Sequence, residues 1–138
     1  MKLLEWCEKR VMVDKVIDAS ALAAVLFGEP DGEAVVNLLK GAVLVAPTLL
    51  RFELTNVCLT KIRRHPADRD KLVSAFKLLA RMEIQTVDVD HPGVLEMAEE
   101  TGLTAYDASY LWLAHRLRAD LVTLDRKLDA AFATASRN

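Results

Sequence analysis

Four acidic residues, spread along almost the whole chain, are the side chains best suited to chemistry. Asp18 ends the apolar run KVID, and Asp125 ends the run LVTLD near the other end of the sequence. Glu53 follows LLRF, and Asp107 lies within TAYDASY. Carboxylates that converge repel one another and lose hydration, so a hard divalent cation such as Mg²⁺ or Mn²⁺ is the ion expected to neutralise them. The corresponding site is one that binds a divalent metal ion through oxygen ligands.

Each of these acids also has a purely structural explanation. Asp18 and Asp125 could each cap the helix that follows, because an Asp side chain accepts hydrogen bonds from the free N–H groups of a first helical turn. Glu53 falls at the edge of an apolar helical stripe, where a long acidic side chain can simply reach solvent. Asp107 would be favoured by the positive end of its helix dipole. Four such positions together are harder to explain by structure alone.

Strands and helices alternate in the pattern of this sequence, which indicates a parallel sheet covered on both faces. In such sheets, binding sites form beyond the carboxyl ends of the strands, where Asp18 and Asp125 are expected. Thr48, Asp90 and Thr104 are the expected N-caps of three helices. The expected strands are 13–18, 42–47, 84–89 and 119–125, and the expected helices are 19–28, 31–41, 48–65, 67–82, 91–102, 105–118 and 126–135.

Length and composition favour one soluble domain. The chain has 138 residues, of which 52% are hydrophobic, and no apolar run reaches the roughly 18–20 residues of a membrane span. Glu5 and Glu8 interrupt the apolar part of the N-terminal segment, so a secretory signal is not expected. Two cysteines are too few for a disulfide framework. We therefore expect a cytoplasmic location. The net charge of −2 gives no global attraction to nucleic acid, so any such role must rest on local cations, for which KIRRH (61–65), Arg126 and Lys127 are candidates.

One helix carries a possible partner surface. Tyr106, Tyr110 and Leu113 share one face of helix 105–118, whereas Trp112 lies roughly opposite them. We interpret Trp112 as either an exposed tryptophan or part of an interface, and favour the interface. Together with the largely apolar composition, this predicts a homodimer.

Four segments, in order, resemble the motifs of one known family: VIDASAL, FELTNV, TAYDASYLWLA and LVTLDRKL. They resemble those of the PIN-domain ribonucleases, and most of all the VapC-type toxins of type II VapBC toxin–antitoxin pairs. The resemblance runs from about Met12 to the C-terminus, which makes 1–11 an N-terminal extension and 12–138 a PIN domain. It implies a single domain with a central parallel β-sheet of four or five short strands flanked by about seven α-helices.

The resemblance also implies a site and partners. It makes Asp18, Glu53, Asp107 and Asp125 the catalytic acids and the ligands of Mg²⁺ or Mn²⁺. The implied activity is that of an endoribonuclease that hydrolyses RNA phosphodiester bonds, and the implied partners are a second copy of the chain and a cognate VapB-type antitoxin that blocks the active-site groove. The supporting residues that match the family pattern are Ser20, Asn56, Thr104 and Thr123.

Two other functions stay open at this point. A receiver-type phosphoacceptor domain is also a small parallel α/β fold with an acidic metal pocket, but it would need paired acids after its first strand, and VIDAS supplies one. A non-catalytic RNA- or protein-binding PIN-like module is the second alternative. The intact set of four acids argues against this second alternative, and only an activity measurement separates it from the nuclease.

Overall fold

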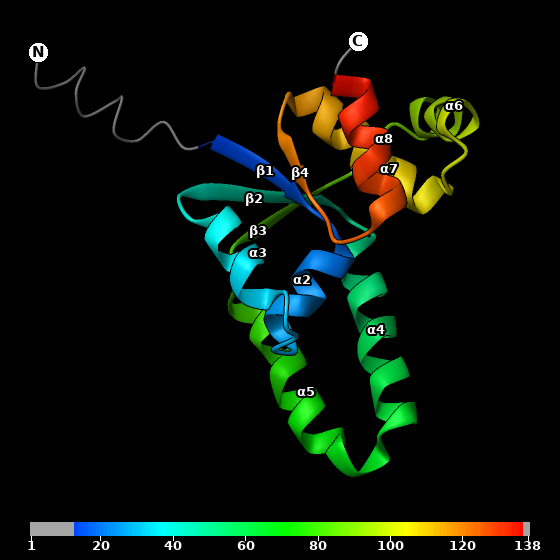
Figure 1. Ribbon diagram of the computed structural model, residues 1–138. Helices are drawn as coiled ribbons and strands as arrows, with labels where there is room; N and C mark the ends of the chain where they lie inside the picture. Colours follow the sequence, from blue (N-terminus) through cyan, green and yellow to red (C-terminus); the bar gives the residue numbers. More distant parts are fainter. Residues whose placement is uncertain (1–12, 137–138) are drawn as a thin grey trace, which may run out of the picture.

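Four short parallel strands form the centre of the protein in the computed structural model, which describes residues 13–136 (Figure 1). In spatial order they are β3 (Ile84–Val87), β2 (Ala42–Pro47), β1 (Val13–Ile17) and β4 (Asp120–Val122). The register pairs Val16 with Val45 on one side and with Leu121 on the other. These three side chains are buried, as expected for strands covered on both faces.

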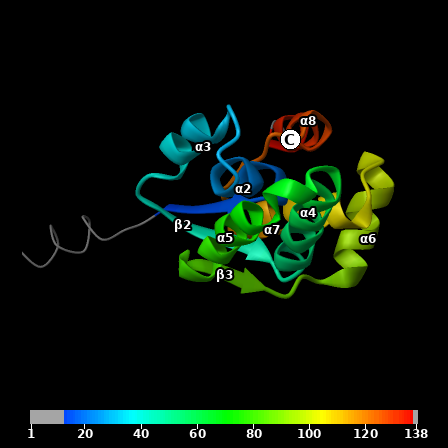
Figure 2. The ribbon, with the colours of Figure 1, turned by 90° about the horizontal axis from the view of Figure 1, so that it is seen from below.

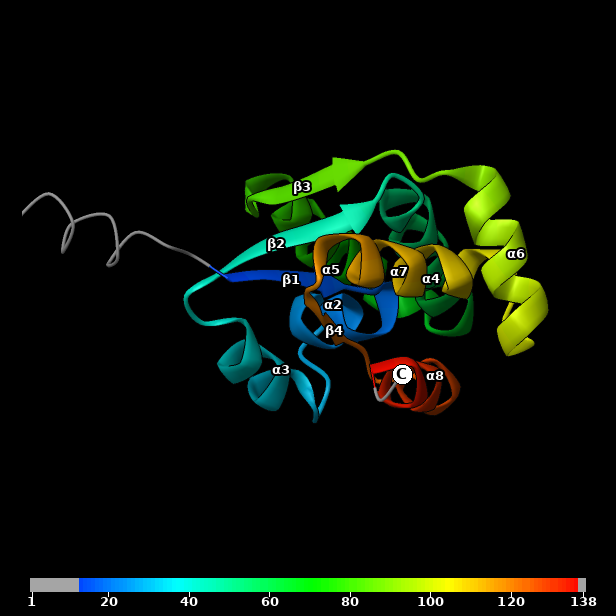
Figure 3. The same cartoon turned by 90° about the horizontal axis from the view of Figure 1, so that it is seen from above.

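Helices cover both faces of this sheet. α7 packs on one face, and α2, α4 and α5 lie on the opposite side of the sheet, as the opposite views of Figures 2 and 3 show. This arrangement confirms the predicted α/β domain, with a four-stranded parallel sheet and seven flanking helices in the described residues. The helices are α2 (Ala19–Leu26), α3 (Gly32–Leu39), α4 (Leu50–Arg64), α5 (Arg69–Lys77), α6 (His91–Thr101), α7 (Ala105–Leu117) and α8 (Arg126–Ser136), with short 3-10 turns η1 (Pro66–Asp68) and η2 (Leu78–Arg81).

The helix α7 is buried on more than one side, which corrects the prediction of a single apolar stripe. Its neighbours are the sheet, α6 and α8. Tyr106, assigned to the apolar face, is 66% exposed, whereas Leu111 is fully buried. Trp112 is half-buried against the core, and its indole Nε1 would lie 2.7 Å from a Cβ added at Gly93 of α6. The interpretation of Trp112 as an exposed or partner-facing residue was therefore wrong, because α6 packs over it.

Several predicted boundaries also change. Asp90 and Thr104 cap α6 and α7 as predicted, but Leu49, not Thr48, precedes α4, and no side chain caps that helix. The backbone N–H of Thr48 instead donates to the carbonyl of Val87, which extends the pairing between β2 and β3. The predicted helix 67–82 is divided into η1, α5 and η2, and the tightened last turn buries Leu79.

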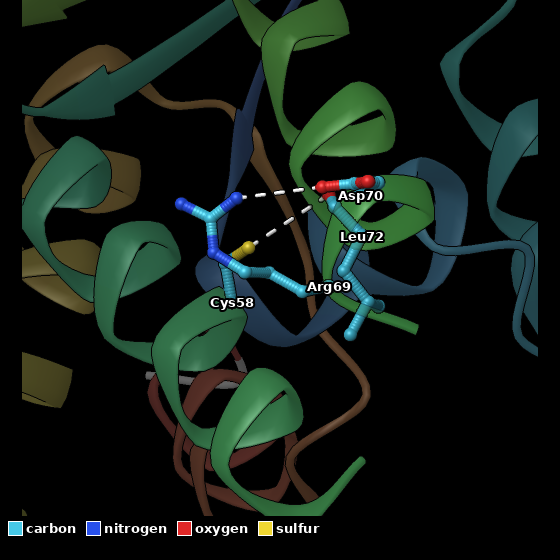
Figure 4. A network of polar contacts seen from close by, with 4 residues as sticks. All are labelled: Cys58, Arg69, Asp70 and Leu72. Atoms are coloured by element: carbon cyan, nitrogen blue, oxygen red, sulfur yellow. Dashed lines mark hydrogen bonds and ion pairs between the residues drawn. The ribbon is translucent and has the colours of Figure 1, made fainter. Parts of the chain in front are cut away.

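α4 and α5 form a helical hairpin that extends away from the sheet (Figure 1). Pro66 starts the turn between them, as its sequence position predicts. Near the middle of the hairpin, the thiol of Cys58 donates a weak hydrogen bond to the carbonyl of Leu72 at 3.8 Å (Figure 4). The proposed extension, residues 1–11, lies outside the described residues. Across the described part of the chain, every helix is too short or too polar to span a bilayer.

Candidate acidic active site

The site lies where the strand order reverses. From β1 the chain proceeds to β2 and β3 on one side of the sheet and then returns to β4 on the other. Parallel sheets bind ligands at such a point, beyond the carboxyl ends of the strands. Asp18 follows β1 directly, and its backbone N–H donates to the carbonyl of Val122 at 3.2 Å. The first and the last of the four acids are therefore brought to one edge by the sheet itself.

Asp18 is almost completely buried and is held by three donors. Its Oδ1 accepts from the Ser20 hydroxyl at 2.7 Å and from the Ala21 N–H at 3.0 Å, and its Oδ2 accepts from the Thr123 hydroxyl at 2.6 Å. The bond from Ala21 makes Asp18 the N-cap of α2, which confirms the predicted capping role of Asp18. Burial raises the pKa of Asp18, the three hydrogen bonds lower it in part, and the charge of Asp125 raises it further.

Side chains also tie the segment after β4 to the end of β1. Thr123 Oγ1 accepts from the N–H of Asp125 at 3.0 Å, and Ser20 Oγ accepts from the N–H of Leu124 at 2.9 Å. The Asp125 Oδ1 accepts from the N–H of Leu128 at 2.9 Å and so caps α8. β4 ends at Val122, earlier than predicted, because these bonds turn the chain away from the sheet.

Glu53 joins the site through a tyrosine that the sequence did not single out as functional. The Tyr110 hydroxyl donates to Glu53 Oε1 at 2.6 Å, which links the first turn of α4 to α7. Burial raises the pKa of Glu53, the bond from Tyr110 lowers it, and the charges of Asp107 and Asp18 raise it. The pKa of Tyr110 is raised far above its ordinary value, chiefly by burial and then by Glu53, so this phenol remains a donor.

Asp107 occupies the first turn of α7, where its backbone N–H donates to the Thr104 hydroxyl at 3.1 Å. Partial burial raises the pKa of the Asp107 carboxyl, and the charges of Asp125 and Asp18 raise it further. Lys127 lowers it, as a nearby cation should. Three of the four acids thus have pKa values raised by other members of the set.

Lys127 is the predicted basic residue that reaches this site. Its ammonium donates to the carbonyl of Gly102 at 3.1 Å while acting on Asp107. Of the predicted supporting residues, Asn56 is exposed on α4 and forms no hydrogen bond with the four acids in the described part of the chain. Ser20, Thr104 and Thr123 make the contacts described above.

The donor chemistry of this site fits a hard cation. The converging groups are carboxylates, and oxygen ligands are the preference of Mg²⁺ and Mn²⁺. As the side chains stand, however, no three Asp, Glu, His or Cys groups among residues 13–136 are close enough to hold one ion. Burial, and then the charges of the other acids, raise the pKa values of Glu53 and Asp107, and a bound cation would offset that cost.

Comparisons with known proteins agree with this fold. The family model described as the PIN domain matches residues 15–132. The crystal structure of PAE2754 from Pyrobaculum aerophilum is similar, with a TM-score of 0.70 and 27% sequence identity, over 89% of this chain and 92% of that one. No curated protein matches the sequence.

Proposed function

This chain belongs to the PIN-domain family, whose members are generally metal-dependent nucleases, and from that premise we propose that it is an endoribonuclease dependent on Mg²⁺ or Mn²⁺. The observation that supports the proposal most is the group of carboxylates at the reversal point between β1 and β4. Three of them have pKa values raised first by burial and then by the charges of other members. The charged forms of these carboxylates therefore destabilise one another, and a bound cation would offset that cost.

In this proposal Asp18, Glu53, Asp107 and Asp125 would hold the ion. When bound, a divalent ion of this kind polarises the scissile phosphate and lowers the pKa of a coordinated water. The rest of the chemistry falls to the chain. The hydroxyls of Ser20 and Thr123 fix both oxygens of Asp18, and the Tyr110 hydroxyl fixes one oxygen of Glu53.

A proton acceptor is also available. Glu53 and Asp107 are half-buried carboxylates at this site, and a carboxylate within reach of a water can act as a general base. Either can take the proton of the attacking water. Lys127, which lies near enough to lower the pKa of Asp107, adds one positive charge where the phosphate would lie.

We further propose that the protein is a VapC-type toxin. The motifs that support this are VIDASAL, FELTNV, TAYDASYLWLA and LVTLDRKL. The proposed partners are RNA, a second copy of the chain and a VapB-type antitoxin. Expression with and without the neighbouring small gene, followed by mapping of new 5′ ends across cellular RNA, tests the toxin role and identifies the substrate.

The nuclease activity is tested with purified protein and RNA. We expect cleavage with Mg²⁺ or Mn²⁺, none in EDTA, and a loss of at least a hundredfold in Asp107→Asn, the order of effect expected when a catalytic group is removed. Asp90→Asn is the matched control, because Asp90 caps α6 at the same edge of the sheet through the N–H of Gly93. RNA binding without cleavage would favour the non-catalytic alternative, and cleavage in EDTA would contradict the metal.

A further inference from the structure

Charge is distributed very unevenly along this chain. Residues 51–81, which we call the basic hairpin, comprise nearly all of α4 together with η1, α5 and η2. They contain eight Lys and Arg but only three Asp and Glu, a net charge of +5. Because the whole chain carries −2, the remaining residues carry −7. The basic hairpin is therefore the long segment of the chain whose net charge attracts a polyanion.

Most cations of the basic hairpin are available to a ligand. Lys61 is engaged by Glu29 at 2.8 Å and lies over the ring of Phe27. Arg69 has only a 3.5 Å contact with Asp70, whose side chain is fully exposed, and such pairs are weak (Figure 4). The exposed cations of the hairpin that form no ion pair within residues 13–136 are Arg51, Arg63, Arg64, Lys71, Lys77 and Arg81.

One face of α4 connects the acidic site to the tip of the hairpin. Arg64 is eleven residues beyond Glu53, so the two side chains leave the helix within about 20° of each other and about 16 Å apart along the axis. Thr60 lies on the same face between them, and Glu53 is the only acid in α4. The tip projects from the body of the protein, so a long ligand at the acids can also reach it (Figure 1).

We propose that the basic hairpin binds the RNA backbone, with Arg63 and Arg64 contacting phosphates while the scissile bond lies at the acids. This inference rests on the proposed function in taking RNA as the ligand. The acidic site by itself repels a polyanion, and the hairpin supplies the attraction that holds the strand in place. At about 3.4 Å per nucleotide, the 16 Å between Glu53 and Arg64 corresponds to about five nucleotides of stacked strand.

Salt dependence of RNA binding tests this surface. The probe is a fluorescein-labelled single-stranded RNA of about 20 nucleotides, titrated in EDTA at several salt concentrations and followed by fluorescence anisotropy. The variant is Arg63→Gln with Arg64→Gln. We expect the slope of log K against log salt to fall by about 1.4, because each phosphate contact on a single strand contributes about 0.7. Thermal melts confirm that the variant is folded.

The matched control removes two positive charges elsewhere. Lys40 and Arg116 are exposed and precede β2 and β4, so they lie at the opposite edge of the sheet from the acids. Lys40→Gln with Arg116→Gln should leave the slope unchanged. The proposal would be overturned if the wild type and both double variants had equal slopes. It would also be overturned if both double variants showed the same reduction of the slope. A hairpin that binds an acidic protein instead of RNA would give the first of these results.

Cleavage assays separate this inference from the proposed function. With Mg²⁺, the Arg63 and Arg64 double variant should show a raised KM for RNA and an unchanged kcat, since neither residue lies near the acids. Wild-type protein that binds RNA with the expected slope but never cleaves it would refute the nuclease while leaving the hairpin surface intact. If the wild-type protein cleaves RNA but the double variant has the same salt slope as the wild type, only the proposed hairpin surface is refuted.

Discussion

The hydrogen bond between Tyr110 and Glu53 allows a sharp test of how the site is held together. Tyr110→Phe removes only the hydroxyl, which donates to Glu53 Oε1 at 2.6 Å, and keeps a ring that is 1% exposed. A hydrogen bond to a charged group contributes about 1.5–3 kcal/mol. Because Glu53 is only half-buried, water replaces part of the lost bond, and we expect a loss of about 1 kcal/mol, or about 4 °C in melting temperature for a domain of this size.

The same substitution should act in a pH-dependent way. The folded-state pKa of Glu53 lies above its ordinary value of 4.5, and the bond from Tyr110 lowers it. Without that bond the pKa rises further, so the charged form of Glu53 is destabilised more in the variant. A group with a raised pKa reduces stability as the pH rises from its unfolded value through its folded value. The effect of Tyr110→Phe should therefore be smaller at pH 3.5, where Glu53 is protonated in both states, than at pH 7.5.

Thermal melts at these two pH values, in EDTA, measure this difference. Tyr106→Phe is the matched control, because Tyr106 belongs to the same helix and is 66% exposed. It should change the melting temperature little at either pH. If Tyr110→Phe lowers the melting temperature equally at pH 3.5 and pH 7.5, the hydroxyl of Tyr110 acts through packing and not through Glu53. A decrease of the same size in Tyr106→Phe would lead to the same conclusion.

Three further predictions concern the fold and the assembly. Gly93→Ala should destabilise the protein by about 1–3 kcal/mol, because the new Cβ would lie 2.7 Å from Trp112 Nε1 and 2.8 Å from Asp90 Oδ2; an unchanged melting temperature would contradict this packing. A chain that starts at Met12 should fold and cleave RNA, and a melting temperature lowered by more than about 5 °C would make the leader part of the core. The isolated protein should be a homodimer in light scattering at micromolar concentration, and a clean monomer mass would refute that proposal.

The sequence predicted the parts of the site that depend on strand ends. Asp18 and Asp125 each follow a short apolar run, and a parallel sheet brings the carboxyl ends of its strands to one edge whatever the details of packing. The capping roles of Asp90 and Thr104 were equally predictable, because they depend on local hydrogen bonds. These features need no knowledge of how the helices cross.

Features that depend on helix crossings could not be predicted in the same way. The bond between Tyr110 and Glu53 exists because α7 passes the first turn of α4, although the position of Tyr110 three residues after Asp107 was a usable signal. Trp112 was misassigned because the apolar-stripe argument assumes one buried face, whereas α6 covers a second face of α7. The roles assigned to the four acids remain predictions.

Metal binding by Asp18→Asn tests the central claim most directly. In the folded protein, burial and the charge of Asp125 raise the pKa of Asp18, so the loss of its charge relieves repulsion in the metal-free protein at pH 7, and Asn caps a helix about as well as Asp. Wild-type protein titrated with Mn²⁺ should gain about 2.7 kcal/mol of stability at a hundred times its Kd. Melting curves recorded over the same Mn²⁺ series should show that gain in the wild type and little or none in Asp18→Asn. An equal gain in both proteins would contradict the account, because Asp18 would then be a helix cap and not a ligand.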